Sequence, residues 1–310
     1  MGFSILWIFF YHSIFFGKVH YSFVHSLINA GYGGVDFFLF LSSYGLFLSM
    51  QRDSNIFCFY KKRLFRIIPT FFVMSLATFI VVNKLRLGWD ILSIKFWYGQ
   101  LYSNWFISAI LIFYMFFPFL YNNLIKRPYF SLFSCFFISI VFTYVSIITN
   151  HGDIHAPIML FVTRIPIFFL GAFFAFKNKL LDKSNLLIFL FGIGVLLLVL
   201  MNAFNFEYLF NFCFVIIVPG SIILLIRIFD LMRGRISKVI GFFGTISLEL
   251  YLVHMLLMPP VLNKYVPMFG GYLTVFILLL ICTGSSFLLQ KILSSILSFK
   301  LQKIYHEKSK

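Results

Sequence analysis

The chain has 310 residues, of which 61% are hydrophobic and only 11% are charged, and its mean hydropathy is +0.99. Soluble domains carry about 25% charged residues, because charged groups must cover their surface. This composition therefore excludes a soluble enzyme, a nucleic-acid-binding domain, a disordered chain and a coiled coil. The net charge of +16 is typical of a membrane protein whose Lys and Arg set its orientation and meet anionic lipid headgroups.

The apolar residues form continuous runs rather than an alternating pattern, which favours helices over a transmembrane β-barrel. A helix needs roughly 20 apolar residues to cross the hydrocarbon core of a bilayer. We expect one all-α membrane-embedded domain over residues 1–310, with about ten transmembrane helices. The predicted segments are 3–16, 34–50, 67–83, 104–125, 129–149, 158–176, 185–202, 210–228, 240–262 and 271–290.

The basic residues are unevenly divided between the two sides of this arrangement. With the N-terminus in the cytoplasm, nineteen of the 25 Lys and Arg fall on the cytoplasmic side and five on the other. Such an excess is the usual mark of cytoplasmic loops. We therefore expect both termini in the cytoplasm and a multi-pass protein of the cell membrane. The longest connection, 84–103, contains Trp89 and Trp97 and is predicted to lie at the membrane interface.

Ionisable side chains at membrane depth are rare and costly, so each is a candidate functional residue. Five lie within the predicted spans: His12, Asp36, Arg164, Glu249 and His254. His12 is either a structural histidine bonded to a neighbouring helix or a general base, because its ordinary pKa lies near neutrality. Asp36 either complements the dipole of its helix or orients that histidine.

Arginines supply a second group of candidates. Arg63 and Arg66 are spaced to share one helix face, where they either anchor the cytoplasmic end of a span or bind phosphate groups. Arg164 lies within a span and requires a carboxylate, carbonyl groups or an anionic ligand. Glu249 is one candidate partner for it. Trp105 begins a span beside polar residues.

Several stretches of the sequence together resemble the integral-membrane acyltransferase family 3, whose members O-acylate sugars and other hydroxyl groups. The resemblance covers nearly the whole chain, and its motifs follow in the family's order. They are His12 on the opening helix, the Gly-Val-Asp stretch 34–42, the Arg-x-x-Arg-x-x-Pro stretch 63–69, the Trp…Tyr…Pro helix 105–118, the Arg-x-Pro-x-Phe-x-x-Gly stretch 164–171 and the Ser…Tyr-Leu-x-His stretch 247–254.

This resemblance implies acyl transfer from a cytoplasmic acyl-CoA, expected to be acetyl-CoA, to a hydroxyl of a cell-surface glycan or its lipid-linked precursor. His12 would be the catalytic base and Asp36 its orienting partner. Acyl-CoA would be a donor substrate rather than a permanently bound cofactor, and neither a metal nor nucleic acid is implied. Membrane lipids are the remaining expected partners.

The donor-binding residues implied by the resemblance are Arg63, Arg66, Trp105, Tyr114 and Arg164. Trp105 and Tyr114 are also candidates for stabilising the oxyanion. The competing interpretation is a multi-pass transporter or exporter of a glycan or lipid, which composition and topology fit equally well. A structural scaffold would leave the ionisable residues within the spans unexplained.

Two positions depart from the family pattern. Met1 stands where the family often has an arginine, and Ser42-Ser43 replaces a Ser-Gly pair. The first span is also short, since 14 residues extend only about 21 Å. We therefore expect an upstream extension that carries a basic residue.

Overall fold

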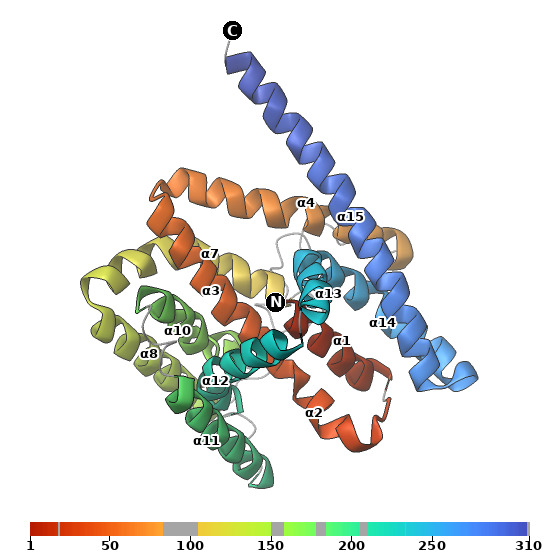
Figure 1. The fold of residues 1–310 in the computed structure, drawn as a ribbon, viewed down its shortest axis with the longest axis horizontal. Helices are drawn as coiled ribbons and strands as arrows, with labels where there is room; N and C mark the ends of the chain where they lie inside the picture. The colour runs from red at the N-terminus through yellow and green to blue at the C-terminus, as the bar shows by residue number, and fades with distance from the viewer. Residues whose placement is uncertain are drawn as a thin grey trace. The chain divides into compact units, whose positions relative to one another are not determined.

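A computed structural model describes residues 1–17, 19–82, 105–149, 158–177, 184–204, 210–232 and 234–308. Within these ranges the chain is helical and contains no strand (Figure 1). The helices follow the apolar runs, because a chain surrounded by lipid must satisfy its backbone hydrogen bonds internally. The all-α prediction is therefore confirmed. The predicted interfacial segment with Trp89 and Trp97 lies outside the described residues.

Seven of the described helices are long and apolar enough to cross a membrane, and a bent pair raises this number to eight. A shorter apolar helix, α1, spans Gly2–Gly17. Over the described residues, each of the ten predicted segments coincides with helical structure, although the number of crossings and the side on which the termini lie stay predictions. The chain divides into two compact units, which are described separately; the prediction of one domain is not tested by this division.

The first unit contains residues 33–63 and 92–239 together with Met1. Its helices are α3 (Gly34–Arg52), the start of α4 (Ile56–Val82), α7 (Trp105–Lys126), α8 (Pro128–Thr149), α10 (Ile165–Phe176), α11 (Ser184–Ala203) and α12 (Phe210–Leu231). The closest helix pairs are α3 with α10 and α11 with α12, and both pairs lie side by side in Figure 1.

Phenylalanine rings fill the interior of this unit, where Phe113 stacks on Phe168 with ring centroids 4.3 Å apart. Small residues bring the helices together, since a Cβ on Gly171 of α10 would collide with the Phe40 carbonyl of α3. In contrast, only 17% of the apolar stretch of α8 and 11% of the apolar stretch of α11 are buried inside the structure. Their exposed apolar faces fit lipid, which supports a multi-pass membrane protein.

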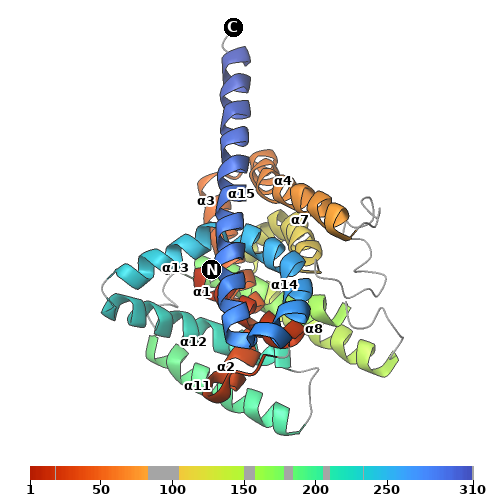
Figure 2. The same ribbon diagram turned by 90° about the vertical axis from the view of Figure 1, so that its right-hand side faces the viewer.

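The second unit contains residues 2–32, 64–91 and 240–310. Besides α1 and the rest of α4, it holds the short helices η1 (Ser22–Val24), α2 (His25–Asn29) and η2 (Ala30–Gly33), the end of α13 (Arg235–Thr245), α14 (Ser247–Phe269) and α15 (Gly271–Lys308). Helix α14 packs against both α1 and α15. Figure 2 shows α15 as one continuous helix that carries the C-terminus.

The predicted span 240–262 is not one straight helix. It breaks between α13 and α14, whose axes are bent by 72° at Ile246. The sequence there has neither proline nor a run of polar residues, so the apolar pattern predicted a single helix. The break places Glu249 in the first turn of α14, where a carboxylate is favoured by the positive end of the helix dipole.

Candidate active site

Two histidines from opposite ends of the sequence meet in the second unit. His12 Nδ1 of α1 lies 2.8 Å from His254 Nε2 of α14, a hydrogen-bond distance. His254 is completely buried, and its Nδ1 lies 2.6 Å from the Leu250 carbonyl oxygen one turn earlier. His12 is only partly buried. The pair therefore combines a partly buried histidine with one that the protein encloses completely.

The position of His12 is fixed by close packing around α1. A Cβ on Gly2 would collide with the Ile240 backbone, and one on Gly31 would come within 2.6 Å of the Trp7 carbonyl oxygen. The Trp7 indole also donates a hydrogen bond to the Leu27 carbonyl oxygen at 2.8 Å. A residue larger than glycine could not pack so close to either neighbour. These contacts hold α1 against α13 and the turn that follows α2.

An ion pair lies in the first turn of α14, before His254. The carboxylate of Glu249 is fully buried and receives both terminal nitrogens of the Arg66 guanidinium, with Nη2 at 2.9 Å from Oε2. Arg66 also donates to the Thr245 carbonyl oxygen at the break between α13 and α14. Thr70, one helical turn after Arg66, donates to Glu249 at 3.4 Å. Arg66 thus ties α4 to the bend.

A different ionic cluster lies in the first unit. Arg164 Nε is 3.6 Å from Asp36 Oδ1, and both side chains are almost completely buried. The Arg164 guanidinium also donates to the Leu160 carbonyl oxygen at 3.0 Å and lies 5.0 Å from the centre of the Trp105 ring. The cluster therefore gathers three of the residues selected from the sequence, and the arginine is stabilised by a carboxylate, a carbonyl and an aromatic face.

The local sequence explains why Arg164 is available there. The helix that begins at residue 158 is interrupted by a turn at Thr163 and Arg164, and α10 starts at Ile165. Pro166 lies in the first turn of α10, where its missing N–H costs no helical hydrogen bond. Thr163 donates to the Met159 carbonyl oxygen at 2.6 Å. The interruption lets the arginine turn towards α3 and α7.

These contacts correct one pairing. Glu249 was the candidate partner of Arg164, but within their own units Glu249 binds Arg66 and Arg164 faces Asp36. Charge alone could not choose between two carboxylates for two arginines. The pairing of His12 with Asp36 joins residues of different units and stays a prediction.

Arg63 differs from Arg66 in its surroundings. Its guanidinium lies 5.2 Å from the centre of the Phe59 ring, and it interacts electrostatically with Tyr114 of α7. The structure thus brings together two of the predicted donor-binding residues in the first unit. Their binding of acyl-CoA stays a prediction.

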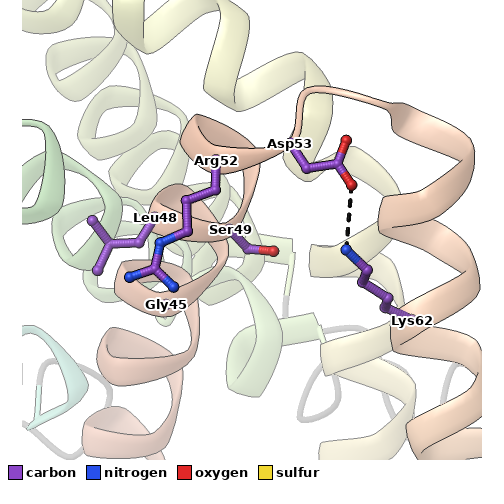
Figure 3. A pocket seen from close by; sticks show the side chains of 6 residues that line it. All are labelled: Gly45, Leu48, Ser49, Arg52, Asp53 and Lys62. Carbon is purple, nitrogen blue, oxygen red and sulfur yellow. Dashed lines mark hydrogen bonds and ion pairs between the residues drawn. The ribbon is translucent and has the colours of Figure 1, made fainter.

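A cavity of about 410 Å³ opens at the turn between α3 and α4, and Figure 3 shows its lining. Its residues are Gly45, Leu48, Ser49, Arg52, Asp53 and Lys62. Lys62 Nζ lies 3.3 Å from Asp53 Oδ2. Two contacts lower the pKa of the Asp53 carboxyl: the hydrogen bond from the Asn55 backbone N–H makes the larger contribution, and Lys62 makes the smaller one. Since the carboxylate offsets part of the positive charge, the cavity alone does not define a class of ligand.

Metal binding receives no support from the residues that the structure describes. They contain no group of three or more His, Cys, Asp or Glu side chains that could hold a metal ion. Among the described residues, the clusters present are a histidine pair and two carboxylate–arginine pairs.

The fold and these clusters define a multi-pass helical membrane protein with polar side chains enclosed among its helices. Residues 2–291 match the family model described as an acyltransferase domain, so the chain belongs to acyltransferase family 3. It is a membrane acyltransferase. No curated protein and no solved structure matches it.

Some residues of these clusters were not selected from the sequence. Thr70 is four residues after Arg66 and therefore on the same helix face, so helical spacing was a usable signal for it. Tyr11, whose ring centre is 5.4 Å from that of His12, looked like one of many aromatic residues on an apolar helix. Nothing in its spacing distinguishes it from the rings that face lipid.

Proposed function

We propose that this acyltransferase moves an acetyl group from cytoplasmic acetyl-CoA to a hydroxyl of a cell-surface glycan or its lipid-linked precursor in the cell membrane. The observation that carries the proposal is the imidazole of His12, a residue of intermediate exposure, hydrogen-bonded at 2.8 Å to a buried second imidazole. A neutral imidazole that a substrate can reach is suited to act as a general base. Family membership supplies the acyl chemistry.

In the proposed reaction, His12 accepts the hydroxyl proton while the hydroxyl oxygen attacks the thioester carbonyl carbon. The carbon–sulfur bond then breaks, and the proton on His12 is returned to the leaving CoA sulfur. The products are an acetyl ester and CoA as a free thiol, so atoms and charges balance. An oxyanion forms during the attack and requires a hydrogen-bond donor, a role for which Trp105 and Tyr114 are the candidates.

The donor roles of the remaining residues follow from the family motif. Arg63 and Arg66 are proposed to meet the phosphates of CoA, and Arg164 to belong to the same donor site. Arg66 already binds Glu249 through two nitrogens, and Arg164 already faces Asp36. Arg63 has no carboxylate contact among the described ion pairs, and we assign it the larger share of phosphate binding.

The transporter interpretation makes a different prediction, and one experiment separates the two. Purified protein in liposomes is given acetyl-CoA labelled in its acetyl group, together with lipid-linked sugars extracted from host membranes. We expect label on the sugar and one free thiol for each acetyl group transferred. Movement of unmodified sugar across the liposome membrane, with no labelled product, would show a transporter instead.

A further inference from the structure

The hydrogen bonds of the histidine pair determine which ring nitrogens carry hydrogen. A carbonyl oxygen only accepts, so His254 Nδ1, which lies 2.6 Å from the Leu250 oxygen, must carry a hydrogen. A neutral imidazole has a single N–H, and His254 Nε2 therefore presents a lone pair. His12 Nδ1, 2.8 Å from that nitrogen, must then be the donor. The lone pair of neutral His12 is left on Nε2, the nitrogen that faces away from His254.

We propose that His254, in place of Asp36, is the positioning residue that fixes the tautomer and ring orientation of His12. This inference rests on the proposed function, in which His12 Nε2 accepts the proton of the acceptor hydroxyl. When that proton arrives, His12 becomes an imidazolium whose Nδ1–H already points at the lone pair of His254. A hydrogen bond to a charged donor is stronger than one between neutral groups, so the contact stabilises the transition state more than the resting state.

The surroundings of the two rings separate their roles. His254 has no exposed surface and is flanked by Phe9 and Tyr251, whose ring centres lie 5.5 and 5.6 Å from its own. A substrate hydroxyl cannot reach a ring enclosed in this way. His12 is partly exposed at the end of the chain of hydrogen bonds. The enclosed ring therefore orients, and the reachable ring reacts.

The hydrogen bond from His254 to Leu250 explains how the His254 ring is oriented without a charged partner. The Leu250 carbonyl oxygen is four residues before His254, so it is the usual acceptor of the backbone N–H at position 254 and has a second lone pair for the ring. A carboxylate in this place would need a compensating charge to be buried. The helix thus supplies an orienting partner that is neutral.

Two variants test the assignment, and each keeps one of the two hydrogen-bonding positions of the His254 ring. In His254→Gln the side-chain amide reaches the position of Nε2 and offers an acceptor to His12, whereas His254→Asn keeps the donor near the Leu250 carbonyl and loses that acceptor. We expect His254→Asn to lower kcat by about ten- to a hundredfold with an unchanged donor KM. His254→Gln should retain clearly more activity. Membrane abundance and thermal unfolding in detergent serve as controls.

Equal rates for the two folded variants, or a faster His254→Asn, would overturn the assignment. A measurement on the unsubstituted chain covers the case in which neither variant folds. In protein labelled with ¹⁵N-histidine, nitrogen NMR should find both rings with the hydrogen on Nδ1, and His12→Ala identifies the His12 signal. A hydrogen on Nε2 of neutral His12 would contradict the proposal. Failure of the proposed function is distinguishable, because the unsubstituted protein would then transfer no acetyl group.

Discussion

The two units enclose polar side chains in different ways. In the first, Asp36 and Arg164 form an ion pair 3.6 Å apart that is almost fully buried beside Trp105. In the second, His12 and His254 form a hydrogen bond between imidazoles, of which one is partly exposed. Burying opposite charges is costly unless each keeps its partner, so the first cluster depends on its pairing. The second cluster consists of imidazoles, which can accept and donate protons, and one of them belongs to a partly exposed residue.

We expect this difference to show in which variants lower stability first and which lower the rate of reaction first. Asp36 and Arg164 compensate each other, and neither is free to change charge without leaving the other unpaired. An imidazole has one nitrogen that accepts a proton and one that donates it, which suits proton transfer. The chemistry is therefore expected at the histidines, and the ion pairs are expected to affect stability first.

The largest effect on stability is expected when the buried ion pair is broken. Arg164→Met leaves the Asp36 carboxylate, which has no exposed surface, without its compensating charge. Such a loss costs about 3–5 kcal/mol. The double variant Asp36→Asn with Arg164→Met should recover most of that loss, because no charge remains buried. Thermal unfolding in detergent measures both. A double variant as unstable as the single one would show that the ion pair is not the source of stability.

A smaller effect is expected at the ion pair of the second unit. Arg66→Gln leaves Glu249 buried, but the arginine side chain is 45% exposed, so water can compensate part of the loss. We expect about 1.5–3 kcal/mol. Arg63→Gln is the matched control on the same helix, since its guanidinium lies over the Phe59 ring. It should leave stability nearly unchanged and raise the donor KM. The reverse result, a stable Arg66→Gln with only a raised KM, would make Arg66 a phosphate ligand alone.

The packing that supports the ion pair is tested by a single methyl group. Gly171→Ala places a Cβ against the Phe40 backbone and the Ser43 hydroxyl, so α3 and α10 must separate. Overpacking of this kind costs about 1–3 kcal/mol. Gly192→Ala in α11 is the control, because nothing lies within 4 Å of its Cβ. That variant should be equally stable or more stable. An unaffected Gly171→Ala would show that this contact between the helices is not tight.

The sequence was sufficient to locate the helices because lipid leaves a spanning chain few alternatives. It also identified the ionisable residues within the spans, since each is exceptional in an apolar run. It could not pair them: Glu249 was a candidate partner of Arg164 but binds Arg66, because the outcome depends on which helices pack together. It also missed the bend at Ile246, where the residues on both sides read as one apolar helix. Pairings and bends arise from tertiary packing, which periodicity does not encode.

The most direct test of the account is acetyl transfer by His12→Ala. His20→Ala is the matched control, because His20 is an exposed histidine of the same unit. Both proteins are purified, checked for equal thermal stability and supplied with labelled acetyl-CoA and lipid-linked sugars. Loss of a general base lowers a rate by about 10²–10⁴-fold, so His12→Ala should be nearly inactive while His20→Ala matches the unsubstituted protein. A folded His12→Ala variant that transfers acetyl groups at the unsubstituted rate would contradict the account.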